Sequence, residues 1–162
     1  MLKVRPATPD DAVAVGAITR AVYLGDGFAD VIRAPAYVAD LSNGRRRIAE
    51  STVFVASMRE RVVGSVAAVD ASSGLSNLAR IGELEVRMLG VLEGARGCGV
   101  ATALMHACHV HARDSALAAV VLSTDPLMVA ARHLYEILGY LRTPERDWCA
   151  DGVELITYRL PL

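Results

Sequence analysis

The stretch with the clearest chemical character is residues 91–104, VLEGARGCGVATAL. It places three glycines and Arg96 between a strand-like run and an alanine-rich run that reads as a helix. Glycine lets a ligand approach the backbone closely, and a helix N-terminus carries unpaired N–H groups and partial positive charge. The combination predicts an anion site suited to phosphate or pyrophosphate, with the Arg96 guanidinium as a further donor. The alternative is a strand-to-helix turn in which glycine only relieves strain.

Two common nucleotide motifs are absent from this stretch. No Gly-Lys-Ser/Thr sequence closes the loop, which excludes a Walker-type phosphate loop. Gly97 and Gly99 are followed by Thr102 rather than by a third glycine, so the dinucleotide pattern GxGxxG is also missing. A nucleotide-binding protein that uses the loop in another way remains a hypothesis.

Two carboxylates, Glu83 and Glu85, are candidates for a general base. They lie two residues apart in the strand-like run 81–91, IGELEVRMLGV, so they face the same side if the alternation is unbroken. Carboxylates on a strand among apolar residues are unusual unless they border a cleft. The alternatives are a solvated sheet edge or an ion pair with Arg80 or Arg87. The residues themselves leave open whether Glu83, Glu85 or water is the base.

Tyr135 is the candidate for a general acid. Its helix carries an apolar stripe of Leu127, Ala131, Leu134 and Leu138. Tyr135 is predicted at the shoulder of that stripe, where its ring can be covered while its hydroxyl reaches a cleft. The alternative is a tyrosine that only packs.

Other reactive side chains give weaker patterns. His106 and His109 can share a helix face while His111 points away, and no further ligand follows at metal-binding spacing, so we expect a solvated face and no metal. Cys98 is a weak candidate for a covalent nucleophile. The run 45–47, RRR, predicts a solvated helix end, or alternatively the rim of a groove for an acidic substrate.

Composition limits the class of protein. The chain has 162 residues, which suits a single domain spanning 1–162. Its net charge of −1 provides no broad basic surface for nucleic acid. No apolar run approaches the roughly 18 residues of a membrane span, and the N-terminus lacks the apolar core of a signal peptide. We therefore expect a cytoplasmic protein that binds neither nucleic acid nor membrane.

The elements that must position these groups alternate between strands and helices, which predicts an α/β fold. Thr8, Pro9 and Asp11 form the signature of a capped helix start. A polar turn at Arg59-Glu60 joins two β-rich runs into a hairpin. Strands are expected at 3–5, 52–57, 61–69, 81–91, 119–123, 140–148 and 153–160, and helices after Thr8, as short pieces within 28–50, at 99–114 and from Asp125 to Gly139.

Taken together, several segments resemble the GNAT superfamily of N-acetyltransferases. RGCGVA at 96–101 is similar to the coenzyme A signature of that family, matched at Arg96, Gly99 and Ala101. EVRMLGV at 85–91 resembles the splayed central strand, and ARHLYEILGY at 131–140 resembles the second conserved helix. VRPATPDDA at 4–12 looks like the first strand and helix start, so the resemblance covers almost the whole chain.

The resemblance implies a mixed, mostly antiparallel sheet that is splayed at a bulged strand and has helices on both faces. It implies acetyl-CoA as cosubstrate, an amine as acceptor and Tyr135 as general acid. It also favours Glu85, which matches a carboxylate position common in the family, as the base, acting through water. An N–H group near 89–91 could polarise the thioester carbonyl. The residues that the resemblance assigns to acetyl-CoA are Leu89, Gly90, Val91, Arg96, Gly97, Cys98, Gly99, Val100 and Ala101.

One position departs from the family pattern. Met128 stands where the family often has an asparagine that contacts the pantetheine arm. A binding or sensing module for acyl-CoA without turnover is therefore the alternative function. The sequence does not identify the acceptor, and a homodimer stays open.

Overall fold

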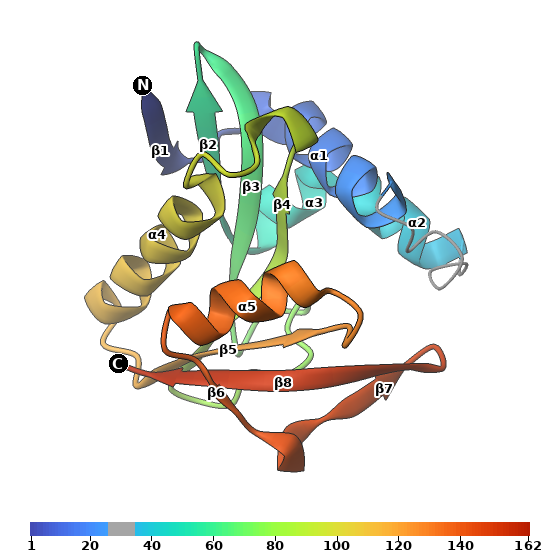
Figure 1. Cartoon of the computed structure of the whole chain (residues 1–162), viewed down its shortest axis with the longest axis vertical. Helices are drawn as coiled ribbons and strands as arrows, with labels where there is room; N and C mark the ends of the chain where they lie inside the picture. The colour runs from blue at the N-terminus through green and yellow to red at the C-terminus, as the bar shows by residue number, and fades with distance from the viewer. Residues whose placement is uncertain (26–34) are drawn as a thin grey trace.

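The computed structural model describes residues 1–25 and 35–162. At its centre is a sheet of order β1-β2-β3-β4-β5-β8-β6, with β7 paired to β8 (Figure 1). Within the described chain, β4 and β5 are the one parallel pair, and every other pairing is antiparallel. The strands are β1 Leu2–Pro6, β2 Thr52–Met58, β3 Arg61–Asp70, β4 Glu83–Val91, β5 Ala119–Thr124, β6 Leu141–Arg142, β7 Trp148–Ala150 and β8 Val153–Pro161.

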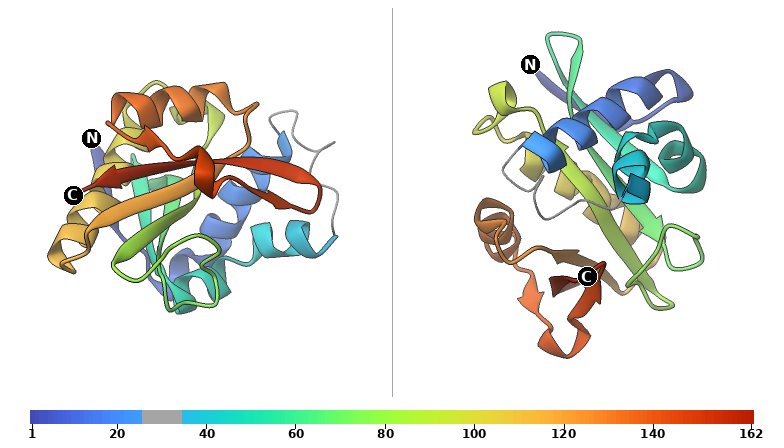
Figure 2. Two further views of the ribbon diagram at one scale, coloured as in Figure 1. Left: turned by 90° about the horizontal axis from the view of Figure 1, so that it is seen from below. Right: turned by 90° about the vertical axis from the view of Figure 1, so that its right-hand side faces the viewer.

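Helices cover both faces of this sheet, as the sequence predicts (Figures 1 and 2). One apolar cluster joins the sheet to α1 and α3, and a larger one joins it to α4 and α5. The α-helices are α1 Ala12–Gly25, α2 Pro35–Ser42, α3 Gly44–Glu50, α4 Val100–Asp114 and α5 Val129–Ile137. Short 3-10 turns are η1 Pro9–Asp11, η3 Glu93–Ala95 and η4 Pro144–Arg146. The mixed α/β class is confirmed. Of the region predicted as short helices, 28–34 lies outside the described residues.

Local signals in the sequence fix several of these boundaries. The predicted capping box is present. Thr8 is the N-cap of η1, and the Asp11 carboxylate accepts a hydrogen bond from the Thr8 backbone N–H. Arg5 binds both oxygens of Asp11 at 2.7 and 2.9 Å, and this contact lowers the pKa of Asp11 to about 2. Arg59 and Glu60 both have positive φ, which is the geometry of a two-residue hairpin turn between β2 and β3.

Two glycines allow α1 and α3 to cross closely. A Cβ on Gly16 would lie 2.2 Å from the carbonyl oxygen of Ser42, and one on Gly44 would lie 2.1 Å from that of Ala12. No real Cβ tolerates such distances, so only glycine permits this approach. These contacts join the first half of α1 to the end of α2 and the start of α3. Tyr23 and Tyr37 lie towards the opposite ends of α1 and α2, and the Tyr23 hydroxyl reaches the Leu89 carbonyl of β4.

The central feature is the separation of β4 from β5. They pair only from Glu83 to Glu85, after which β4 continues along β3 and β5 continues along β8. Met88 has a φ of 56°, and the β3–β4 register shifts there, so β4 is bulged at Met88. The splayed, bulged strand expected from the resemblance is confirmed.

The bulge also corrects an expectation about faces. Unbroken alternation would place Gly90 with Leu84 and Val86, which pack in the α4–α5 cluster. Instead, a Cβ on Gly90 would meet Ile18 of α1 at 3.3 Å. The extra residue at the bulge inverts the alternation, because side chains in a strand change sides with period two.

Some predicted boundaries are wrong. The helix expected from Asp125 begins at Val129, and Leu127, assigned to its buried stripe, is 67% exposed. The strand expected at 140–148 is broken by η4 into the short strands β6 and β7. Arg47 is not a solvated helix end: it is buried and donates to Thr19 Oγ1 and to the carbonyls of Asp40 and Leu41.

Across residues 1–25 and 35–162, none of the helices combines the length and the hydropathy of a membrane span.

Candidate functional site

A cavity of about 420 Å³ lies where β4 and β5 separate. This volume is within the range of about 300–1,000 Å³ that is usual for small-molecule sites. Its walls come from α1, α2, both strands, the start of α5 and the β7–β8 hairpin. The described lining residues are Tyr23, Tyr37, Asn77, Glu85, Val86, Arg87, Met88, Leu89, Ser123, Thr124, Asp125, Met128, Tyr135, Trp148, Ala150, Asp151, Val153 and Leu155.

Tyr135 lines this cavity and is the one described residue of α5 that is buried. The sequence predicted Tyr135 at the edge of the buried stripe of this helix, but its side chain lies at the centre of the buried face. Its ring packs against the rings of Tyr140 and Tyr158. Burial raises the pKa of its phenol, so the hydroxyl is protonated at neutral pH. The side chain can therefore donate a proton inside the cavity.

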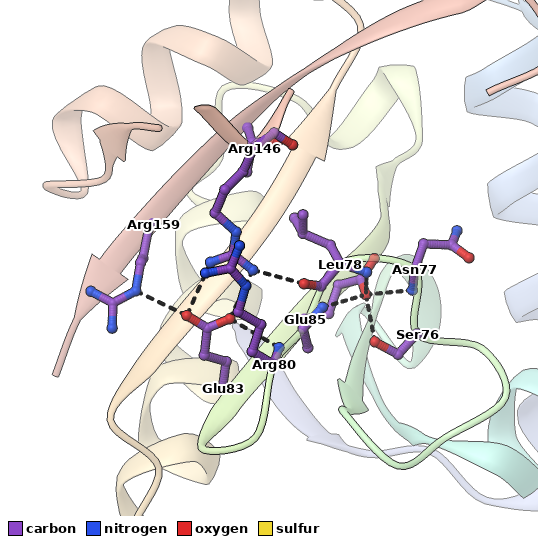
Figure 3. Close-up of polar contacts among 10 residues, drawn as sticks. Ser76, Asn77, Leu78, Arg80, Glu83, Glu85, Arg146 and Arg159 are labelled. Atoms are coloured by element: carbon purple, nitrogen blue, oxygen red, sulfur yellow. Dashed lines mark hydrogen bonds and ion pairs between the residues drawn. The ribbon is translucent and has the colours of Figure 1, made fainter. Parts of the chain in front are cut away.

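Glu85 also lines the cavity, and its carboxylate is buried and held by the loop at 76–79 (Figure 3). Its Oε2 accepts hydrogen bonds from Ser76 Oγ at 2.9 Å and from the backbone N–H groups of Asn77, Leu78 and Ala79 at 2.8, 2.9 and 3.4 Å. Oε1 lies 3.7 Å from Arg87 Nε. Because Oε2 is occupied as an acceptor, Oε1 is the oxygen available to other groups.

Glu83 lies outside the cavity lining, in a buried ion-pair network. It binds Arg146 through both oxygens at 2.9 and 3.0 Å, and Arg159 Nε at 3.0 Å (Figure 3). The Arg80 N–H completes the set at 3.0 Å. Burial opposes the charged form of Glu83, but the donors from Arg146, Arg80 and Arg159 hold its pKa below the usual value. Glu83 thus takes the ion-pair alternative, with Arg146 and Arg159 in place of the expected partners.

The glycine-rich loop joins η3 to the N-terminus of α4. Gly97 and Gly99 have φ values of 73° and 76°, and Gly99 is the N-cap of the helix. A Cβ on either would meet nothing within 4 Å, so the loop surface is open. Arg96 and Cys98 are exposed beside it, and Arg96 Nε donates to the Val91 carbonyl at 3.3 Å. The first-turn N–H groups of α4 therefore face a surface that an anion can reach.

The outer half of β4 connects the loop to the cavity. Leu89 lines the cavity, and its carbonyl accepts a hydrogen bond from the Tyr23 hydroxyl at 3.2 Å. Of the residues assigned to acetyl-CoA, Leu89 alone is in the described lining of the cavity, and the loop lies beyond it. The structure thus brings Tyr135, Glu85 and Leu89 to one cavity and places the loop separately.

Sequence reasoning missed most of the aromatic lining. Tyr23 and Tyr37 come from α1 and α2, and Trp148 comes from β7. The indole Nε1 of Trp148 is buried and has no hydrogen-bond partner among the described residues. One available signal was rarity, since Trp148 is the single tryptophan of the chain.

The histidines of α4 are not one solvated face. His109 is buried, and its Nε2 lies 2.8 Å from the Tyr140 hydroxyl. Burial lowers the pKa of His109 to about 4, so the ring is neutral at pH 7. Among the described residues, no group of three His, Cys, Asp or Glu side chains that could hold a metal occurs.

Comparisons with known proteins agree with this geometry. Residues 26–140 match the model of the acetyltransferase (GNAT) family. The chain is 32% identical to N-acetyltransferase 8F1 of Rattus norvegicus over 120 residues, which cover 70% of this chain and 52% of that protein. It therefore spans about half the length of this relative.

Solved structures share the fold. An acetyltransferase of the GNAT family from Staphylococcus aureus Mu50 superposes with a TM-score of 0.76 at 12% identity, covering 100% of this chain and 99% of that one. YncA from Salmonella typhimurium, solved with its cofactor acetyl-CoA, gives a TM-score of 0.72 at 18% identity, covering 100% and 94%. With the family model spanning most of the chain, and with the splayed strand, cavity and glycine loop in place, this chain belongs to the GNAT acetyltransferase family.

Proposed function

We propose that the chain is an N-acetyltransferase that moves the acetyl group of acetyl-CoA directly to an amine acceptor in a ternary complex. The observation that carries this proposal is one cavity that holds a buried phenol, Tyr135, and a buried carboxylate, Glu85, at the point where β4 leaves β5. The bound acetyl-CoA of the Salmonella relative supports the choice of cosubstrate.

The cosubstrate fits the residues present. The open loop surface around Gly97 and Gly99 leaves room for phosphate oxygens against backbone N–H groups. Beyond Glu85, β4 has no strand partner on its β5 side among the described residues, so its backbone can face the amides of the pantetheine arm. The residues that would hold it are Leu89, Gly90, Val91, Arg96, Gly97, Cys98, Gly99, Val100 and Ala101.

Glu85 and Tyr135 then each take part in a different proton transfer. Acetyl-CoA supplies a thioester carbonyl carbon. The acceptor ammonium first loses a proton to water held near Glu85 Oε1. The amine nitrogen forms a C–N bond to that carbon while the carbonyl becomes an oxyanion, and an N–H group of β4 near 89–91 stabilises it.

Collapse of the intermediate breaks the C–S bond, and Tyr135 donates its phenolic proton to the departing sulfur. The proton shed by the nitrogen then restores the phenol. The net products are the N-acetyl amine, coenzyme A and one proton. The phenol of Tyr135 is protonated at neutral pH, and burial raises its pKa further above its ordinary value.

A non-catalytic acyl-CoA-binding module is the second candidate. Met128 supports it, because the family asparagine is replaced by a thioether that accepts a 3.7 Å contact from Thr124 Oγ1 and lines the cavity. Protection by coenzyme A without release of free thiol from acetyl-CoA in the presence of amines would establish this alternative. Protection by ATP instead would indicate a nucleotide-binding protein.

The test is thiol release from acetyl-CoA with a panel of amines, for the native chain and Tyr135→Phe. The variant keeps the buried ring, so the melting temperature and its increase with coenzyme A should persist. Turnover should fall by about 10²- to 10⁴-fold if Tyr135 is the acid. Turnover within a few-fold of the native value would make Tyr135 a packing residue, whose replacement by Ala should cost about 3–5 kcal/mol of stability.

Binding at the loop is checked with Gly99→Val, which should lose the coenzyme A shift in melting temperature. Gly82→Val is the matched control, because Gly82 also has positive φ and a Cβ there also meets nothing within 4 Å, but it lies outside the 96–101 loop. Equal shifts in both variants would remove the loop from the proposed site.

A further inference from the structure

We propose that the acceptor is a primary amine on an apolar, aromatic body that carries no carboxylate next to the amine. The inference rests on the proposed acetyltransferase function and names the substrate class of the same cavity. Two observations carry it: the concentration of aromatic rings in the lining and the excess of acidic over basic side chains.

Aromatic side chains are scarce in the chain and gather at the cavity. The sequence has one Trp, five Tyr and two Phe, and half of these, Tyr23, Tyr37, Tyr135 and Trp148, line the cavity. Tyr23 is held in place by its hydrogen bond to the Leu89 carbonyl. Val153 and Leu155 extend the wall that Trp148 forms on the β7–β8 hairpin. These rings match a flat apolar body, and aromatic pairs gain energy beyond their buried area.

The charges of the lining match an ammonium group. Glu85, Asp125 and Asp151 are acidic, and Arg87 is the one basic residue among the described lining. Arg87 pairs with Glu85, whose Oε1 lies 3.7 Å from its Nε, and its Nη1 donates to the Leu75 carbonyl. Asp125 and Asp151 therefore carry the excess of negative charge in the described lining. A cation beside tyrosine and tryptophan rings gains further from their negative faces.

The same charges disfavour an α-amino acid as acceptor. Its carboxylate would enter a cavity with three acidic side chains and would find no basic partner among the described lining other than Arg87. Like charges brought together in this way are strongly unfavourable. Specificity here thus comes from repulsion of the carboxylate as well as from attraction of the ring and the ammonium.

The experiment compares kcat/KM for phenethylamine, ethylamine, phenylalanine and phenylalaninamide with acetyl-CoA. Phenethylamine should exceed ethylamine by about 10- to 200-fold, the range of discrimination by apolar pockets. It should exceed phenylalanine by at least about 100-fold, because the carboxylate meets like charge. Phenylalaninamide should recover most of that loss, since it has the size of phenylalanine without the negative charge.

The variant Trp148→Ala tests whether the ring of Trp148 causes the preference for phenethylamine over ethylamine. It should lower kcat/KM for phenethylamine by about 10-fold or more and leave ethylamine nearly unchanged. Glu154→Ala is the matched control, because Glu154 is exposed on the same hairpin and outside the described lining. The coenzyme A shift in melting temperature verifies that each variant folds.

The outcomes separate the two proposals. No thiol release with any amine contradicts the proposed function itself. Turnover in which phenylalanine equals or exceeds phenethylamine, or in which Trp148→Ala leaves the preference intact, overturns the acceptor class and leaves acetyl transfer standing.

Discussion

Glu83 and Glu85 occupy the two ends of the short segment in which β4 pairs with β5, and their surroundings differ completely. Glu83 is closed in by side-chain cations, Arg146 and Arg159, from η4 and β8. Glu85 receives a serine hydroxyl and backbone N–H groups from a single loop and borders the cavity. Two identical residues two positions apart on one strand thus have entirely different partners.

The difference shows how the separation of β4 from β5 divides the sheet into a part where the two strands are paired and a part where they are apart. Where β4 contacts β5, the next strand, β8, lies near enough to bring Arg159 to Glu83. After the Glu85–Val121 pair the strands part, and the cavity lies where such partners would be. Glu83, before the split, is held by ion pairs, and Glu85, at the split, borders the cavity for which we propose a catalytic role.

The largest effect that tests this contrast is expected for Glu83→Ala. It leaves the guanidinium of Arg146 buried without its carboxylate, and breaking a buried pair from one side costs about 3–5 kcal/mol. Urea unfolding should show this loss, and Glu145→Ala, an exposed change on η4, should stay within about 0.5 kcal/mol. A loss below about 1 kcal/mol for Glu83→Ala would mean that the network does not hold the sheet together.

The next effect is expected for Glu85→Gln. The amide oxygen can replace Oε2 towards the 76–79 loop, but the side chain can no longer accept a proton from water. Turnover should fall by about 10²-fold, the lower end for a positioned base, with a smaller loss of stability than for Glu83→Ala. The pH profile of kcat, together with the melting temperature, measures both. Turnover close to native would restrict Glu85 to holding the loop, with water as the base.

A smaller, pH-dependent effect separates the two carboxylates further. The pKa of Glu83 lies below its ordinary value of 4.5 in the folded chain, so its stabilisation is complete above that value and is lost as pH falls through the folded pKa. The difference in unfolding free energy between the native chain and Glu83→Gln should therefore shrink between pH 7 and pH 3. A constant difference over that range would show that the charge of Glu83 is not what stabilises the fold.

The sequence predicted those features that depend on neighbouring residues. The capping box at Thr8 and Asp11 and the hairpin turn at Arg59-Glu60 are where local backbone preferences place them. The glycines before α4 likewise have the positive φ that glycine alone adopts freely. The splayed strand at 85–91 followed from resemblance, and the fold bears it out.

The sequence did not predict how chain segments far apart come together. The run 45–47 gives no sign that Arg47 is buried against Thr19, because that contact depends on how α3 crosses α1. Trp148 and Tyr23 are far apart in the chain, and only the arrangement of β7 and α1 around the splayed strands brings both to the cavity.

The local conformations follow from the sequence alone: the caps, the turns, the glycine loop and the residue types able to bind an anion or move a proton. The partner of each side chain depends on the tertiary structure. Alternation along 81–91 predicts that Glu83 and Glu85 face the same side and does not distinguish them. The partner that distinguishes Glu83, Arg146, is 63 residues away in the chain. The physical reason is that period and propensity act between near neighbours, whereas charge pairing and cavities depend on the order in which distant strands join the sheet.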